Sequence, residues 1–451
     1  MEGLEITTIK YSEIRSKNFD FRIDSEYFKK EYLKFFDSDN GNNQILGNFA
    51  TVKGGKRLPL GENFADNGTH YIRAEDVKNT FVDYENSPKI SKKVYEQIKS
   101  YQTKKNDVLL TIVGNSIGDI GFVQFDLDIC NLTENCVRLV SNNVNPSYLF
   151  VYFLSKFGQM QINREKVGTA QPKLAIERIR RFKVYKPTET FQSQIESIVK
   201  SAHAKLEESK SLYSQAEDLL LGELGLKDWQ PKNTLHTTKK FSDFAQSGRL
   251  DAEYYQPKYD DLFEKLSCLN CKRLGKIVSI KKSFDPGSDA YQETGIPFIR
   301  VSDISKDGIE KTELHLSPID FDIPELKPKK DTILFSKDGS IGIAYKVQSD
   351  LNVFTSGALL HLVTTDSSIL PDYLTLVLNS VVVKLQAERD SNGAIIQHWK
   401  PSDIENVIIP ILPESIQTKI ASLIQQSFEC KAQSKQLLED AKRMVESEIE
   451  K

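Results

Sequence analysis

The chain repeats its own sequence order once, and this duplication limits the possible folds more than any other feature. The segment RIDSEYF at residues 22–28 is matched by RLDAEYY at residues 249–255, and YIRAEDV at residues 71–77 is matched by FIRVSDI at residues 298–304. Two copies are too few for a stacked repeat array, which needs at least three units. The sequence therefore predicts two tandem, diverged copies of one domain.

A long helix is predicted at the end of each copy. Residues 190–224 contain no proline, and no glycine before Gly222, which is typical of an uninterrupted helix. Apolar or small residues recur there with the four-three spacing of a coiled-coil seam, and polar Ser209 is its weak position. The seam residues are Ile195, Val199, Ala202, Leu206, Tyr213, Ala216 and Leu220. Residues 414–420 (ESIQTKI) repeat residues 189–195 (ETFQSQI) and begin the second helix.

The two helices are expected to pair with each other. A helix of roughly 34 residues is about 50 Å long, so such a rod would hold the two domains apart. Short apolar runs bounded by Gly, Asp and Asn predict strands in each copy, and residues 146–161 and 371–387 predict helices opened by proline. The predicted fold class is α+β, with two tandem domains separated by a coiled coil of two long helices. The predicted parts are residues 1–188 and 226–412 for the domains, and 189–225 and 413–451 for the long helices.

Composition excludes several classes of protein. No apolar run approaches the ~20 residues that a membrane span needs, and the first residues do not resemble a signal peptide, so a cytoplasmic location is expected. Five cysteines do not suggest a disulfide framework. Cys268 and Cys271 have zinc-ligand spacing, but no second pair lies near them, and reduced thiols are the better interpretation.

No catalytic motif is recognisable. The chain lacks a phosphate-binding loop, a His-Glu-x-x-His motif and a nucleophile elbow, and its six histidines do not recur between the copies. Glu325 and Lys327, with Asp303 or Asp307 upstream, fit a nuclease-like pattern only loosely, and a solvated loop is the simpler interpretation. We therefore expect a non-catalytic chain that binds no metal.

Clusters of cations point instead to DNA. The net charge is only −3, but affinity for phosphate depends on where the cations lie. In the first copy a glycine-containing loop could bring backbone amides and cations to a phosphate, and polar loop residues could contact bases. The candidates there are Lys53, Gly54, Gly55, Lys56, Arg57, Arg73, Asn115, Ser116, Arg164, Gln171 and Lys173. The candidates in the second copy are Lys281, Lys282, Ser283, Arg300, Lys337, Ser340, Gln397 and His398.

Two of these candidates have a competing structural interpretation. Arg73 and Arg300 are equivalent in the repeat and could read guanines, but they could also pair with Asp76 and Asp303. Their presence in both diverged copies favours the structural role, because residues that confer specificity should differ between copies.

The chain resembles the DNA specificity subunits of type I restriction-modification systems and their type IIB-like relatives. The resemblance covers essentially the whole chain and rests on the two domains, each followed by a long helix. It also rests on TVKGGKRLP at residues 51–59, GIPFIRVSD at residues 295–303, and DTILFS at residues 331–336 with the Gly-Ser-Ile-Gly that follows.

The resemblance implies a non-catalytic reader in which two pseudo-twofold-related target-recognition domains are separated by an antiparallel coiled coil of the two long helices. At roughly 3.4 Å per base pair, a rod of about 50 Å would span about 15 base pairs of duplex. Its expected partners are double-stranded DNA and two DNA adenine methyltransferase subunits, which would carry S-adenosylmethionine; this chain itself would hold no cofactor. A translocase-nuclease subunit can join such complexes. Two readers would recognise two short sequences separated by an unread gap. The alternatives are a nuclease with a concealed metal site and a duplicated scaffold that binds proteins.

Overall fold

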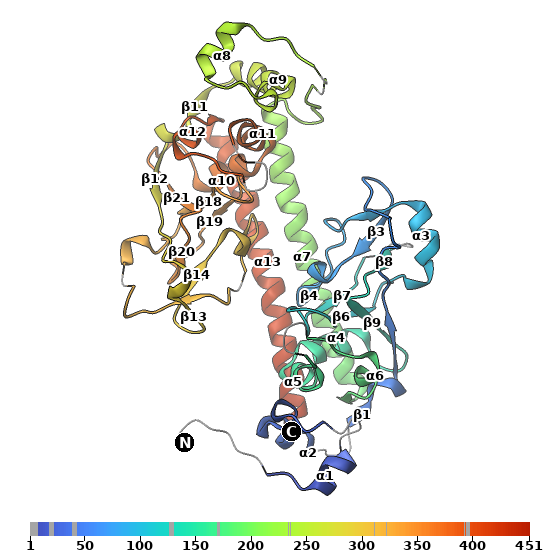
Figure 1. The fold of residues 1–451 in the computed structure, drawn as a ribbon. Helices are drawn as coiled ribbons and strands as arrows, with labels where there is room; N and C mark the ends of the chain where they lie inside the picture. The colour runs from blue at the N-terminus through green and yellow to red at the C-terminus, as the bar shows by residue number, and fades with distance from the viewer. Residues whose placement is uncertain are drawn as a thin grey trace. The chain divides into compact units, whose positions relative to one another are not determined.

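The computed structural model shows two compact units (Figure 1). It describes residues 8–17, 22–37, 43–125, 130–168, 172–232, 234, 236–310, 312–321, 323–391, 393 and 397–451. Unit 1 comprises Met1–Leu206 with Ala432–Lys451, and unit 2 comprises Glu207–Lys431. Both units mix helices and sheets, which confirms the predicted α+β class with a duplicated domain.

Unit 1 contains the first copy of the repeat. Its helices are α1 (Tyr11–Lys17), α2 (Lys30–Asp37), α3 (Lys92–Ile98), α4 (Pro146–Leu154), α5 (Lys156–Glu165), α6 (Ile176–Ile179) and the first half of α7 (Glu189–Glu223). Its strands are β1 (Asn43–Ile45), β2 (Ala50–Gly54), β3 (Thr69–Ile72), β4 (Thr80–Phe81), β5 (Lys89–Ile90), β6 (Val108–Thr111), β7 (Ile120–Phe122), β8 (Cys130–Leu132), β9 (Cys136–Ser141) and β10 (Lys183–Tyr185). The second half of α13 (Glu414–Ile449) completes the unit.

Unit 2 contains the second copy. Its helices besides the remaining halves of α7 and α13 are α8 (Phe241–Ser247), α9 (Pro257–Ser267), α10 (Pro371–Asn379), α11 (Val381–Asp390) and α12 (Pro401–Glu405). Its strands are β11 (Cys271–Arg273), β12 (Val278–Lys282), β13 (Tyr291–Gln292), β14 (Ile296–Ile299), β15 (Ile304–Ser305), β16 (Gly308–Ile309), β17 (His315–Leu316), β18 (Ile333–Ser336), β19 (Ala344–Lys346), β20 (Phe354–Thr355), β21 (Leu359–Thr364) and β22 (Ile408–Pro410).

The sheets repeat the duplication in their topology. The strand order β2-β9-β6-β7 in unit 1 matches β12-β21-β18-β19 in unit 2, with antiparallel neighbours throughout. The pair β1-β10 matches β11-β22, and in each unit a further strand, β3 or β14, has one antiparallel and one parallel neighbour. The central strands β6 and β18 are buried along their whole length, as a continuous apolar run predicts.

One predicted helix in each unit is in fact two. The apolar pattern after Pro146 suggested a single helix, but the chain breaks at Ser155, where φ is −68° and ψ is 161°. Ser380 breaks the corresponding helix in unit 2, with φ at −80° and ψ at 168°. Both serines cap the following helix by accepting a hydrogen bond from a backbone amide, and this local bond competes with helix continuation.

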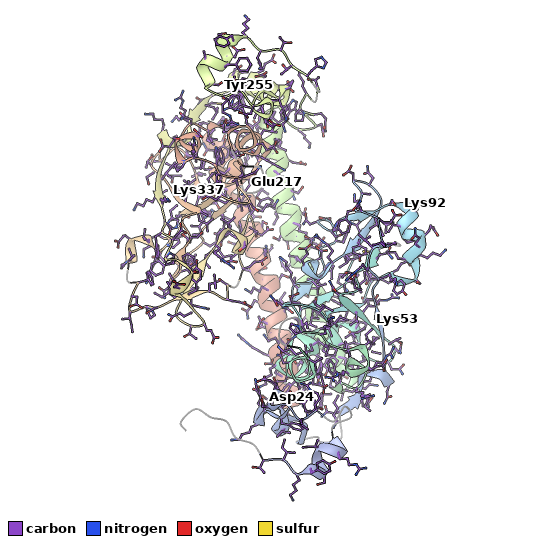
Figure 2. The ribbon with its side chains drawn as sticks, in the orientation of Figure 1. Asp24, Lys53, Lys92, Glu217, Tyr255 and Lys337 are labelled. Carbon is purple, nitrogen blue, oxygen red and sulfur yellow. The ribbon has the colours of Figure 1, made fainter. Side chains whose placement is uncertain are left out.

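Each unit contains one copy of the repeated leader segment (residues 22–28 or 249–255), which is tied to the end of a helix. Arg22 pairs with Asp24 (Nε to Oδ2, 2.7 Å) and donates to the carbonyl oxygen of Arg164 in α5 (2.8 Å). Arg249 repeats this in unit 2, where it donates to the carbonyl oxygen of Asp390 at the end of α11 (3.4 Å). Asp24 is labelled in Figure 2. The repeated leader motif therefore has an internal structural role.

The long helices pair antiparallel within each unit. In unit 1 the early part of α7 shares a core with the late part of α13: Ile195, Val199 and Ala202 with Leu438, Ala441 and Val445. In unit 2 the late part of α7 shares a core with the early part of α13: Ala216, Leu220 and Leu224 with Ile420 and Ile424. Figure 1 shows the two helices side by side in each unit. No helix among the described residues is long and apolar enough to cross a membrane.

Serines interrupt the apolar seam and are bonded there. Ser209, the weak position of the predicted seam, is buried and lies 3.0 Å from Ser427 (Oγ to Oγ). Ser427 Oγ also donates to the carbonyl oxygen of Ser209 (2.8 Å), and Ser434 Oγ donates to the carbonyl oxygen of Ala202 (2.6 Å). The cost of burying these hydroxyls is therefore offset by hydrogen bonds across the helix pair.

Candidate nucleic-acid interface

In unit 1 a loop and a distant segment form one polar surface, here called the first loop pair (residues 112–119 and 172–174). The loop follows β6 and turns back into β7, with Gly114 and Gly118 at φ +94° and +102°. Val113 forms a β-bridge with Lys173, and the Gly114 amide donates to the carbonyl oxygen of Pro172 (3.2 Å). The positive φ of Gly118 is typical of glycine in a tight turn.

Unit 2 builds the same arrangement, here called the second loop pair (residues 337–342 and 397–399). The loop follows β18, with Gly339 at φ +74°, and Asp338 forms a β-bridge with His398. The Gly339 amide donates to the carbonyl oxygen of Gln397 (2.9 Å). His398 stands 225 residues after Lys173, the same offset as between the first residues of α7 and α13. Lys173 and His398 therefore occupy equivalent bridge positions.

The second loop pair carries a chain of charged and polar contacts. His398 Nδ1 lies 2.8 Å from Asp338 Oδ1, and Lys337 Nζ also contacts Asp338. Partial burial acts to raise the pKa of Asp338, but the hydrogen bonds from Lys337 and His398 hold that pKa below its ordinary value. The Lys337 side chain is 13% exposed, whereas the His398 side chain is 64% exposed. Ser340 and Gln397 are exposed beside them.

The first loop pair is simpler. Asn115 and Lys173 are exposed, and Ser116 is half-buried. Among the described residues, the side chain of Lys173 makes no hydrogen bond or ion pair. Gln171, also a predicted contact, lies outside the described residues. The structure therefore brings together candidates that lie about 60 residues apart in the sequence of each copy.

Edge strands add exposed cations to both units. Lys53 on β2 is exposed, and Lys281 and Lys282 are exposed on the equivalent strand β12. Lys53 and Lys337 are labelled in Figure 2. Lys56 Nζ lies 5.9 Å from the centre of the Tyr101 ring. These cations match the predicted clusters in being accessible to a phosphate backbone.

Arg57 is exposed but engaged in an ion pair. Its side chain is 79% exposed, and its Nε lies 2.5 Å from Glu134 Oε1. Partial burial acts to raise the pKa of Glu134, but the hydrogen bond from Arg57 keeps that pKa below its ordinary value. An approaching phosphate would therefore have to compete with Glu134 for this guanidinium.

In the first basic loop, the backbone amides of Gly55 and Lys56 bond to neighbouring backbone and are not free for the predicted phosphate contact. The Gly55 amide donates to the carbonyl oxygen of Cys136 (3.1 Å), and the Lys56 amide donates to that of Leu132 (2.8 Å). Gly54 is paired with Val137 in the sheet. A Cβ on Gly55 would lie 1.9 Å from a main-chain oxygen of the neighbouring segment. Gly55 therefore allows two backbone segments to approach closely, and the amides of Gly55 and Lys56 are already used.

Two further candidates are corrected by their burial. Arg164 is 8% exposed; its Nε donates to the carbonyl oxygen of Tyr27 (3.1 Å), and its guanidinium lies 4.1 Å from the Tyr27 ring centre. Ser283 is 7% exposed and donates to the carbonyl oxygen of Thr355 (2.5 Å). Both side chains are held inside their unit, away from the surface on which DNA contact was predicted.

Arg73 and Arg300 have the structural role that sequence analysis favoured. The amide and the guanidinium of Arg73 bind Asp76, with amide to Oδ2 at 2.8 Å and Nη2 to Oδ1 at 3.2 Å. The Arg300 amide donates to Asp303 Oδ2 at 2.9 Å, and its Nε lies 3.7 Å from the same oxygen. Each aspartate thereby caps a short 3-10 helix, which explains why both pairs persist in the diverged copies.

A cavity of about 600 Å³ lies beside the first loop pair. Arg57, Arg73 and Ser116 line it, together with Asn135. Sequence analysis did not name Asn135 as a candidate. The polar turn after strand β8, in which Asn135 lies, is the sequence feature that indicates it.

Metal ligands do not cluster in the part of the chain that the structure describes: no group of three or more His, Cys, Asp or Glu side chains could hold an ion there. Cys268 is exposed and Cys271 half-buried, and each thiol lies near a carbonyl oxygen of α9 (3.9 and 3.5 Å).

The chain thus consists of two copies of one domain, and each copy exposes an equivalent loop pair. The family model described as "Type I restriction modification DNA specificity domain" matches residues 42–216 and again residues 270–443. This chain therefore belongs to the type I restriction-modification specificity subunits.

The chain is also similar to individual proteins. The specificity subunit of type I restriction enzyme MjaIX from Methanocaldococcus jannaschii is 25% identical over 336 residues, 71% of each chain. That of EcoBI from Escherichia coli is 37% identical over 84 residues, 19% of this chain and 16% of that protein. The crystal structure of the type I restriction-modification S subunit from M. genitalium aligns over 90% of this chain and 94% of that chain, with 14% identity and a TM-score of 0.40.

Proposed function

We propose that this chain is the non-catalytic DNA-reading subunit of its restriction-modification complex, with one half-sequence read by each unit. The recurrence of the loop pair, with the same bridge and the same amide-to-carbonyl bond in both units, carries this proposal. The two loop pairs share a backbone but differ in side chains, so the two half-sequences should differ. The recognised site would then be two short sequences separated by a gap that is not read.

The exposed lysines support DNA binding. Lys53, Lys281 and Lys282 lie on equivalent edge strands, and one strand separates each edge strand from the strand that leads into the loop pair. Cations of this kind release counterions when they contact phosphates, which makes binding weaker as salt rises. They would position each unit on the duplex, while the loop pairs contact base edges.

The proposed partners are two DNA adenine methyltransferase subunits that carry S-adenosylmethionine, and double-stranded DNA. A translocase-nuclease subunit is a further proposed partner. The proposal places the chain in the cytoplasm, together with the DNA that it would read. The catalytic steps belong to the partners, and this chain would determine where they act.

Methylome sequencing tests the proposal. The chain would be expressed with its partner methyltransferase in a host that lacks adenine methylation, and modified adenines would be located by single-molecule sequencing. One gapped motif with two different half-sequences is expected. Methylation at a short continuous sequence, or none with a folded complex, would overturn the proposal.

A salt titration tests the role of the lysines. In the complex, Lys281→Ala with Lys282→Ala should weaken DNA binding about equally for all sequences and reduce the salt dependence by about one counterion per lost contact. Lys92, an exposed lysine on α3, offers a matched control as Lys92→Ala. Unchanged salt dependence in the double variant would remove these lysines from the interface.

Neither alternative gains support from the structure. Glu325 lies in a short 3-10 helix (Pro324–Leu326), and Lys327 Nζ lies 5.6 Å from the centre of the Phe354 ring. The family match is to a DNA specificity domain in both halves, which favours neither a nuclease nor a protein-binding scaffold.

A further inference from the structure

The ring of His398 is oriented by an ionised partner. Asp338, with its lowered pKa, can only accept hydrogen bonds, so the proton between Asp338 Oδ1 and His398 Nδ1 belongs to the histidine. In the neutral ring this places the lone pair on Nε2. Among the described residues, no group contacts Nε2, and the side chain is 64% exposed.

The charge on Asp338 is already balanced. Lys337 contacts the same carboxylate and is only 13% exposed, so it is the closer counter-ion in the less solvated position. Within the described residues, Asp338 and, through it, Lys337 are the charged groups that contact the His398 ring. Because Asp338 accepts the hydrogen bond from Nδ1, the neutral form of the ring presents Nε2 as a hydrogen-bond acceptor.

The equivalent residue in unit 1 has the opposite chemistry. Lys173 holds the same bridge position in the first loop pair and is exposed. An ammonium group has three donors and no acceptor. One position in the duplicated scaffold thus presents a donor in unit 1 and an acceptor in unit 2.

We propose that this bridge position reads one base in each half-site with opposite hydrogen-bond polarity. Lys173 would donate to an acceptor edge, as guanine presents with O6 and N7 in the major groove. His398 Nε2 would accept from an exocyclic amino group, as adenine and cytosine present there. Asp338 acts as a positioning residue, because it sets which ring nitrogen carries the proton. This inference rests on the proposed DNA-reading function and adds which residue reads and what it selects.

A reciprocal exchange tests the inference. The chain would be expressed with its methyltransferase, and the methylated motif compared for the wild type, His398→Lys and Lys173→His. We expect His398→Lys to change one base of one half-sequence from adenine or cytosine to guanine, with the other half-sequence unchanged. Lys173→His should make the reverse change in the other half-sequence. His236→Lys makes the same substitution at an exposed histidine outside both loop pairs and should leave the motif unchanged.

A second variant covers the case in which His398→Lys abolishes activity. His398→Ala removes the acceptor without adding charge, and should lower discrimination at that base roughly tenfold in competition binding with the complex. Asp338→Asn, which frees the ring to adopt either tautomer, should relax selection at the same base.

The outcomes separate this inference from the proposed function. If the wild-type complex methylates no gapped motif, the proposed function fails. If it methylates one, but His398→Lys leaves an active complex with an unchanged motif, or His398→Ala leaves discrimination unchanged, the bridge-position inference is overturned. A change in both half-sequences from one substitution would also overturn it.

Discussion

The buried hydrogen bond between the long helices gives a prediction that depends on which partner is removed. Ser209 and Ser427 are 5% and 4% exposed. Ser427 Oγ reaches both the hydroxyl and the carbonyl oxygen of Ser209, at 3.0 and 2.8 Å. Ser427→Ala would leave the Ser209 hydroxyl buried without this partner, whereas Ser209→Ala would leave Ser427 with its carbonyl acceptor. The two substitutions remove the same kind of atom but should not have the same effect.

The magnitudes follow from the cost of an unpaired buried hydroxyl. That cost is about 1–3 kcal/mol, and replacing both partners by apolar groups is often nearly neutral. Serine to alanine in a helix also gains roughly 0.5 kcal/mol in helix propensity. We therefore expect Ser427→Ala to lower the free energy of unfolding by about 1–2 kcal/mol. Ser209→Ala and the double variant should both lie within about 0.5 kcal/mol of the wild type.

Tryptophan fluorescence can follow this in urea. The chain has two tryptophans, Trp229 and Trp399, and both lie in unit 2, which also contains both serines. The fluorescence therefore reports the unit in which the hydrogen bond is made. Ser434→Ala is a matched control, because Ser434 donates to a carbonyl oxygen of unit 1 and its loss should leave the unit 2 transition unchanged. A double variant destabilised by as much as the sum of the single variants would refute the reasoning.

Three further predictions concern single sites. Gly55→Ala should destabilise unit 1 by more than about 2 kcal/mol, since the new Cβ would meet main-chain oxygens at 1.9 and 2.5 Å. Gly222→Ala, on α7 with no atom within 4 Å of the new Cβ, should instead stabilise the chain by about 0.5–1 kcal/mol. Thermal unfolding measures both, and equal effects of the two substitutions would contradict the prediction. Burial, with a smaller effect of a nearby lysine, lowers the pKa of His361 to about 4, so the unfolded chain binds the proton at a higher pH than the folded chain does. The free energy of unfolding of unit 2 should therefore fall by on the order of 3 kcal/mol as pH falls from about 6.5 to 4, and by less in His361→Gln. A fluorescence transition that does not depend on pH would count against this prediction. Arg138→Met should cost about 3 kcal/mol in urea unfolding followed by circular dichroism, because it leaves the Asp107 carboxylate buried without its 3.2 Å ion-pair partner; a loss below about 1 kcal/mol would show that the other hydrogen bonds of Asp107 suffice.

The duplicated architecture was predictable because it leaves regular patterns in the sequence. Order and spacing of matched segments survive divergence, and the coiled-coil seam needs only the type of residue at each position. The paired serines show the limit of this kind of prediction. Ser209 could be identified as a weak seam position, but its partner Ser427 lies 218 residues away and depends on the register of the two helices.

The candidate interface was only partly predictable for a related reason. Charge and polarity identified Lys53 and His398, but whether a cation is exposed depends on distant contacts. Arg164 bonds to Tyr27, 137 residues earlier, and no residue near Arg164 in the sequence indicates that it is buried. The amides of Gly55 and Lys56 were assigned to a phosphate because the sequence does not show that neighbouring strands already use them.

The composition of unit 1 has a consequence for how the protein is made. Unit 2 is one continuous stretch, Glu207–Lys431, but unit 1 also needs Ala432–Lys451, which the ribosome adds only after all of unit 2. Until then Ile195, Val199 and Ala202 lack the α13 side chains that cover them. The unit that is translated first is therefore completed last. While unit 2 is being synthesised, the apolar face of α7 in unit 1 stays exposed, and a chaperone or a partner subunit that binds this face would protect it from aggregation.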